Sequence, residues 1–97
     1  MLIQAPYKQN DTITFRTSAG EEIVARFVEE NADTLTITKP MALMQNGGGF
    51  GLGPWLLTAD PAQNIAVNKS VVQFVVKTQS DMASQYTQAT TGLAMPG

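Results

Sequence analysis

The 97-residue sequence contains no cysteine and no histidine. These absences exclude disulfides, thiolate nucleophiles, Ser-His-Asp catalysis and every zinc site built from Cys or His, so no metal or other cofactor is expected. No run of about 20 apolar residues occurs, and the N-terminus lacks a charged region followed by an apolar one. The sequence therefore predicts a soluble cytoplasmic protein with no membrane partner.

The sequence has few charged residues and no large excess of either sign. Six basic and eight acidic residues give a net charge of −2 and a pI near 4.8. The basic residues are scattered, whereas a protein that grips duplex nucleic acid through many phosphates usually shows a basic stripe. Duplex DNA is therefore not an expected partner. Binding to a few nucleotides at a repeated site of an oligomer remains open.

Glycine is concentrated in "QNGGGFGLGP", residues 45–54. The dinucleotide pattern G-x-G-x-x-G fails there, because its last position falls on Leu52 or Pro54. The P-loop spacing from Gly48 reaches Gly53, but Pro54 stands where that motif needs lysine. We therefore expect a long, mobile, hairpin-type surface loop that joins two strands and carries Phe50 near its tip.

Alternation of apolar and polar residues is typical of strands and recurs along the chain. It places Ile13 and Phe15 on one face of the first strand, with the turn "SAGE" after it. The expected strands are "TITFRT" (12–17), "EIVARFVEE" (22–30), "TLTITK" (34–39), "PWLLTA" (54–59) and "SVVQFVVKT" (70–78). Five short strands with tight turns predict a mostly β fold, a small and strongly bent sheet or barrel.

The last expected strand is apolar on both faces. Val72, Phe74 and Val76 alternate with Val71 and Val75, so both faces of this strand need cover. The pattern changes after it. An apolar stripe at helical spacing (Met82, Tyr86, Ala89, Leu93) predicts a C-terminal helix that packs on the body. Candidate caps are Ser80 or Asp81 at its start and Gly92, followed by Pro96, at its end. The chain divides into an irregular arm (1–10), the β body (11–78) and the helix with its tail (79–97).

Two segments resemble the motifs of one family. "DTITFRTSAGEEIVARFVEENADTLTITKP" resembles the first Sm motif, and "VNKSVVQFVV" resembles the second, closest to the bacterial Hfq variant. "KPMALMQ…GPWLL" and "DMASQYTQATTGLAMP" are similar to Sm-like proteins encoded by T4-like phages of cyanobacteria, which implies the cytoplasm of the host cell.

The resemblance implies an open five-stranded barrel of the Sm-like type. In such proteins the fourth strand of one subunit pairs with the fifth of its neighbour, and a closed homo-oligomeric ring results. The expected partner of the chain is therefore itself. The expected interface residues are Trp55, Leu56, Leu57, Val71, Val72, Phe74 and Val75.

Sm-type rings bind single-stranded RNA at the pore, through stacking and base-edge hydrogen bonds. The resemblance implies that this chain binds short single-stranded RNA segments at the pore of its ring, as an RNA chaperone or regulator. The loop residues that match the family's positions are Asn31, Asp33, Thr34, Asn68, Lys69 and Ser70. This sequence departs from the pattern, because Asp33 takes the stacking position without an aromatic face and Lys69 is followed by neither the glycine nor the histidine of the family. Asn31, Asp33 and Asn68 are equally explained as turn residues.

The sequence also bears on two other functions, that of an enzyme and that of a protein-interaction adaptor. Glu29, Glu30 and Asp33 form a carboxylate cluster, but charges that flank a turn are more often only solvated. Lys69 and Ser70 are neighbours on a strand pattern and point to opposite faces, so the chain is not expected to be an enzyme. The second alternative is a ring that acts as a protein-interaction adaptor without RNA, with the Phe50 loop and the C-terminal helix as docking surfaces.

Overall fold

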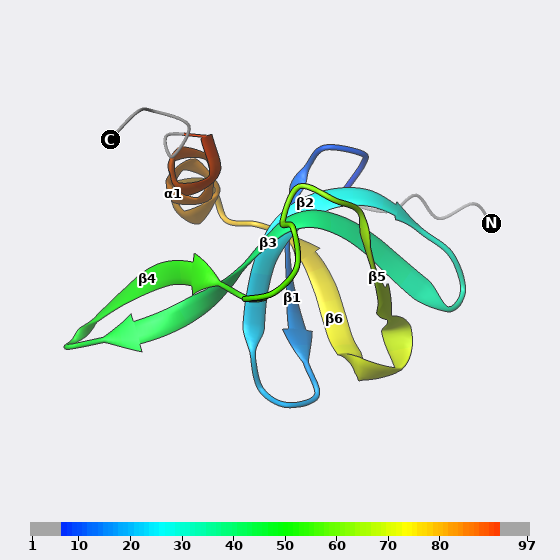
Figure 1. The fold of residues 1–97 in the computed structure, drawn as a ribbon, viewed down its shortest axis with the longest axis horizontal. Coiled ribbons are helices and arrows are strands. Elements are labelled where there is room, and N and C mark those ends of the chain that lie inside the picture. Colours follow the sequence, from blue (N-terminus) through cyan, green and yellow to red (C-terminus); the bar gives the residue numbers. More distant parts are fainter. Residues whose placement is uncertain (1–6, 92–97) are drawn as a thin grey trace.

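The computed structural model describes residues 7–91 of the protein. In this part of the chain, six antiparallel strands form one sheet and an α-helix follows them (Figure 1). The elements are β1 (Thr12–Thr17), β2 (Glu22–Glu30), β3 (Thr34–Asn46), β4 (Gly49–Pro54), β5 (Ile65–Asn68), the 3₁₀ turn η1 (Lys69–Val71), β6 (Val72–Lys77) and α1 (Ser80–Thr91). The predicted mostly β fold with a C-terminal helix is confirmed, but the predicted number of strands, five, is wrong.

The long strand β3 organises the sheet, whose order is β4-β3-β2-β1-β6. Its first residues, Thr34 to Ile37, pair with β5, while its second half, from Met41 onward, pairs with β4. On its other edge β3 pairs with β2. No ladder among the described residues joins β6 to β4 or β5, so the sheet of a single chain is not closed.

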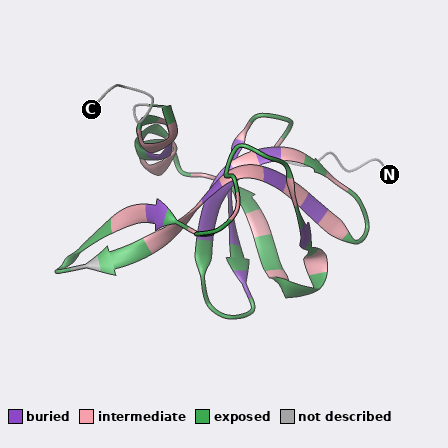
Figure 2. Ribbon diagram, viewed as in Figure 1, coloured by how far each residue is buried: buried purple, intermediate pink, exposed green. Residues whose placement is uncertain are grey.

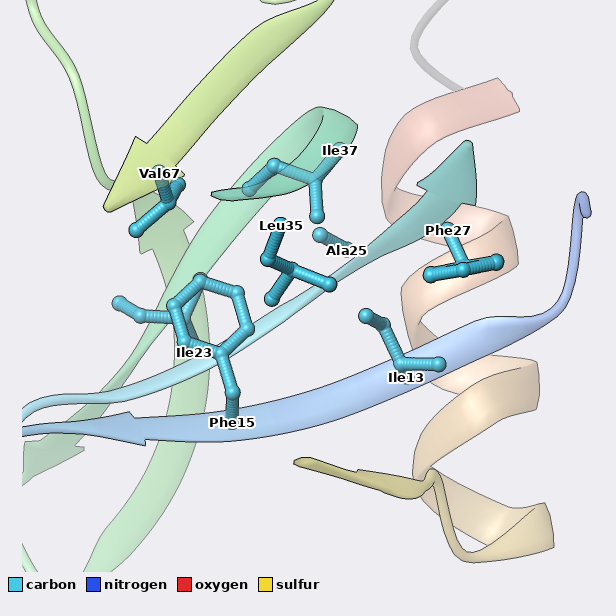
Figure 3. Close-up of a cluster of buried hydrophobic side chains, with 8 residues drawn as sticks. All are labelled: Ile13, Phe15, Ile23, Ala25, Phe27, Leu35, Ile37 and Val67. Atoms are coloured by element: carbon cyan, nitrogen blue, oxygen red, sulfur yellow. The ribbon is translucent and has the colours of Figure 1, made fainter. Parts of the chain in front are cut away.

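The core lies on one face of this sheet and follows the predicted alternation (Figure 3). Its members alternate along β1, β2 and β3, separated by Thr14, Val24, Arg26 and Thr36. Thr14 and Val24 are buried as well, on the opposite face of the sheet. The cluster consists of Ile13, Phe15, Ile23, Ala25, Phe27, Leu35, Ile37 and Val67. The predicted inward residues of the first three strands are thus confirmed.

The predicted faces of the last strand need a correction. Val72 and Val75 both pack against the core, whereas Phe74 and Val76 are 47% and 46% exposed on the opposite side. The cause is a register shift opposite Arg16 and Thr17, where β6 carries one more residue than β1. Such a bulge reverses the alternation along the strand, so positions 72 and 74 do not share a face.

The predicted glycine-rich loop at 45–54 is also corrected, because it is a regular β-hairpin. β3 and β4 pair in unbroken register up to a two-residue turn, Gly47–Gly48. Both turn residues have positive φ, +51° and +95°, as the common two-residue hairpin turn requires. The hairpin extends away from the rest of the sheet (Figure 1). Sequence patterns missed this strand because glycine has low strand propensity.

The predicted strand at 54–59 is wrong, since only Pro54 belongs to a strand there. Trp55 instead packs edge-on against Phe15, with ring centroids 6.0 Å apart, and its indole N–H donates to Glu21 Oε2 at 3.3 Å. Leu57 is 85% exposed. The strand that follows β4 is β5, which lies between the predicted strands at 54–59 and 70–78, where no strand was predicted. Its four residues are recognisable only from their ladder with β3.

Helix α1 confirms the predicted change of period. Tyr86 is fully buried, and its hydroxyl donates a 2.6 Å hydrogen bond to the Lys39 carbonyl of β3. The start is capped by Gln79, whose Oε1 accepts from the Met82 N–H at 3.0 Å, rather than by Ser80 or Asp81. The predicted Leu93 contact and the Gly92 and Pro96 stop signals lie outside the described residues.

Candidate functional site

The two segments predicted to contact RNA lie side by side. Thr34 pairs with Asn68 in the β3–β5 ladder, and the Lys69 N–H donates to the Asp33 carbonyl at 2.8 Å. We call the segments 31–34 and 68–70 together the loop cluster. Backbone hydrogen bonds hold the two segments together, so the sheet topology, rather than side-chain contacts, positions them.

Both asparagines of the loop cluster shape turns. Asn31 Oδ1 accepts from the backbone N–H groups of Asp33 and Thr34, at 2.8 and 2.9 Å. Asn68 Oδ1 accepts from the Ser70 N–H at 3.0 Å and caps η1. These bonds support the turn interpretation of both residues. The side-chain amide N–H groups are the part of each asparagine that a ligand could use, since an amide also donates.

Lys69, the predicted cation of the site, is held by a carboxylate. Its Nζ lies 2.7 Å from Glu30 Oε2, and Tyr7 donates its hydroxyl to Glu30 Oε1 at 2.7 Å. Burial alone would raise the pKa of Glu30, but the hydrogen bonds from Lys69 and Tyr7 and the charge of Lys69 outweigh it and lower that pKa. Burial, and then the bond to Glu30, raise the pKa of Tyr7 to about 12.

The roles of Glu30 and Tyr7 escaped the sequence analysis. Glu30 appeared only in a carboxylate cluster, and Tyr7 lay in a segment with no pattern. The Tyr7 ring packs edge-on against Phe27 at 4.8 Å between centroids, which fixes its hydroxyl over the end of β2. No spacing in the sequence signals this contact, because it joins residues 23 positions apart through the fold.

The loop cluster is electrically neutral, because Asp33 is its one acidic residue and Lys69 its one basic residue. Glu30, at the end of β2, adds a carboxylate that pairs with Lys69. The positive charge of Lys69 is already paired with the Glu30 carboxylate, so little positive potential is left for a phosphate. Asp33 and Asn31 are exposed at the surface of the loop. The geometry suits contacts with amide and backbone groups better than phosphate binding.

The described residues hold no metal-type cluster of three or more acidic side chains, so the Glu29, Glu30 and Asp33 grouping does not converge on a point. Every buried side-chain nitrogen or oxygen among residues 7–91 has a hydrogen-bond partner. The described helix is too short and too polar to cross a membrane.

Comparison with known proteins was made at the level of families and of individual sequences. No protein-family model matches the chain, and a search of curated proteins likewise finds no match. The function is therefore argued from the geometry.

Proposed function

We propose that this protein is an Sm-like subunit that assembles into a homo-oligomeric ring and serves as a protein-interaction adaptor. The observation that carries the proposal is the outer edge of β6, which pairs only with β1 among residues 7–91. Beside this open edge, Val71, Phe74 and Val76 are 41%, 47% and 46% exposed. An open edge with exposed apolar side chains favours pairing with another strand.

The complementary edge in this proposal is β5. Among the described residues β5 pairs only with β3, so its other edge is available to a neighbour's β6. Pairing of two different edges is head-to-tail, and it covers the open edges of β5 and β6 when the ring closes, while the outer edge of β4 takes no part. The predicted interface changes accordingly: β5 replaces the 54–59 segment, and Val72 and Val75 contribute backbone rather than side chains, because they face the core.

The test places a charge at the β6 edge. Phe74→Lys puts an ammonium beside the paired strands, and a lysine there is a device that blocks edge pairing. Native mass spectrometry should give a ring, single or paired, for the natural chain and no ring for the variant. Leu57→Lys is the matched control, because Leu57 is 85% exposed and lies on neither edge. A natural chain that is monomeric, or a Phe74→Lys variant that still assembles, would contradict the proposal.

The pairing of Lys69 with Glu30 supports the adaptor role over RNA binding, because it leaves little positive potential for a phosphate. A second candidate, short single-stranded RNA at the pore, is favoured by one observation: segments 31–34 and 68–70 meet, with two amide side chains exposed between them. Titration with short U-rich and A-rich RNA distinguishes the two. Binding that weakens in Lys69→Ala while the ring stays intact would move the function to RNA, and absence of binding by the natural ring supports the adaptor.

A further inference from the structure

The β3–β4 hairpin is the largest uncharged part of the chain. All six basic and eight acidic residues lie outside residues 40–59, a stretch that contains the whole hairpin and the segment after it. The hairpin extends from the body, and its tip is exposed (Figure 2). A two-stranded hairpin by itself is marginally stable in water, so an exposed, uncharged one is suited to packing against another surface.

One face of this hairpin is apolar apart from Gln45, and the other carries Ala42 and Met44, with the Met44 side chain lying over Gly53. Directly opposed residues of an antiparallel pair lie on the same face, so the pairs Met41–Pro54, Leu43–Leu52 and Gln45–Phe50 share one. We call this the hairpin face. The opposite face carries the alternating glycines at positions 49, 51 and 53. Phe50 is 65% exposed near the tip of the hairpin face, and Leu43 and Leu52 are half-buried in its middle.

The base of the hairpin face opens into an apolar hollow of about 370 Å³. Its walls include Met41 and Pro54 of the hairpin, Pro61 and Ala62 of the following segment, and Ala89 and Thr90 of α1. This volume is at the lower end of the roughly 300–1,000 Å³ typical of ligand pockets, enough for one aromatic side chain. The hairpin face thus has a projecting ring near its tip and a hollow at its base.

We propose that two copies of the chain pack hairpin face to hairpin face in antiparallel fashion, with Phe50 of each copy in the hollow of the other. Phe50 and Pro54 are four residues apart on β4, about 13 Å at the usual rise of a strand. A twofold axis near Leu52 therefore brings each ring over the partner's hollow and the leucines of both copies together. Such an interface is self-complementary.

A second copy fits this surface for a further reason. Each chain has a net charge of −2, but the hairpin residues and the lining of the hollow together carry a single charge, that of Lys39, which would face the partner's uncharged tip. The contact uses neither β5 nor the edge of β6, so it is independent of the proposed ring and would join two rings if both form. An aromatic residue seated in a pocket is also the kind of anchor that dominates binding energy.

Single introduced cysteines provide the first test, since the natural chain has none. Gln45→Cys, which lies opposite Phe50 on the hairpin face and keeps its ring, is mixed with Ala89→Cys and oxidised, and the heterodimeric disulfide is measured against Leu57→Cys mixed with Ala89→Cys. A disulfide requires Cα atoms within about 7 Å, so only the proposed packing favours the first pair. We expect several-fold more heterodimer from that pair. An equal yield from the Leu57→Cys control would overturn the proposal.

Substitution of Phe50 provides the second test. Phe50→Ala should raise the dissociation constant of the face-to-face pair at least about 30-fold, the loss expected for an anchor residue. Phe50→Trp should retain association, and circular dichroism should be unchanged because Phe50 is exposed. If rings form, Phe50→Ala halves the particle mass and leaves single rings, whereas Phe74→Lys breaks the rings themselves. Unchanged association of Phe50→Ala by sedimentation would overturn the hairpin proposal alone.

Discussion

The hydroxyl of Tyr86 reaches across 47 residues of sequence to donate a 2.6 Å hydrogen bond to the backbone carbonyl of Lys39. Lys39 has a φ of +53°, a left-handed conformation that residues with a side chain rarely adopt. Its N–H donates to the Pro61 carbonyl at 2.7 Å. Two long-range hydrogen bonds therefore hold a strained residue at the point where β3 leaves β5 and approaches β4.

Replacing Tyr86 with phenylalanine should destabilise the protein by about 1–3 kcal/mol. The variant keeps the buried ring but leaves the Lys39 carbonyl without its donor, and an unsatisfied buried acceptor carries a cost of that order. The free energy of unfolding in urea measures the change. Thr91→Val is a suitable control, because it removes an exposed hydroxyl bond within the same helix. Equal losses in the two variants would contradict the anchoring role of Tyr86.

Stability should fall at alkaline pH because of the same side chain. Burial raises the pKa of Tyr86 to about 12, partly opposed by the charge of Arg26, whose guanidinium lies 5.7 Å from the ring centre. A folded-state pKa above the ordinary value near 10 means that the contribution is complete below pH 10 and is lost between pH 10 and 12. Tyr86→Phe should flatten this decline in the free energy of unfolding, and Tyr7→Phe should flatten it by a similar amount, since the pKa of Tyr7 is also raised to about 12.

Replacing Lys39 with glycine should stabilise the fold by about 0.5–1 kcal/mol. Glycine adopts positive φ without the steric cost that a Cβ imposes, which exceeds glycine's larger loss of chain entropy. Lys39→Ala is the matched control, because alanine removes the long side chain and keeps the Cβ. Thermal unfolding should place the glycine variant above the natural protein and the alanine variant at or below it. The reverse order would show that Lys39 is not strained.

Two substitutions of Asn31 distinguish a role in shaping the turn from a role in ligand binding. Asn31→Ala removes the acceptor for two backbone N–H groups and should cost about 1 kcal/mol of stability. Asn31→Asp keeps the acceptor oxygens and removes the amide donor, so it should retain most of the stability. A loss of ligand binding in Asn31→Asp at unchanged stability would assign the amide to recognition. Unchanged binding would leave Asn31 as a turn residue only.

The parts of the fold that the sequence predicts are those with a local signal. Alternation identified the core residues of β1, β2 and the first half of β3, and the change of period at Ser80 identified α1. β4 was missed because its alternating partner is glycine, which adds no polarity contrast. The short strand β5 was missed because only pairing with β3 defines it, and pairing is a property of the tertiary structure.

The candidate site was likewise predictable in part: the meeting of its segments was expected, and its side-chain contacts were not. That segments 31–34 and 68–70 lie together was expected from the resemblance to the Sm motifs, and the ladder between Thr34 and Asn68 agrees with it. The pairing of Lys69 with Glu30 and Tyr7 was not expected, since it depends on where the chain before β1 lies. Sequence patterns predict which segments meet better than which side chains neutralise one another.

The regular ladder of β3 with β4 also makes the reach of the hairpin adjustable. Two residues added to each strand would lengthen the arm by about 7 Å, keep the Gly47–Gly48 turn and return Phe50 to the same side. One residue added to each would turn Phe50 to the opposite side. Because β3 beyond Ala42 pairs only with β4 among the described residues, such changes leave the core untouched. Evolution or design can therefore set the span between two partners by pairs of residues.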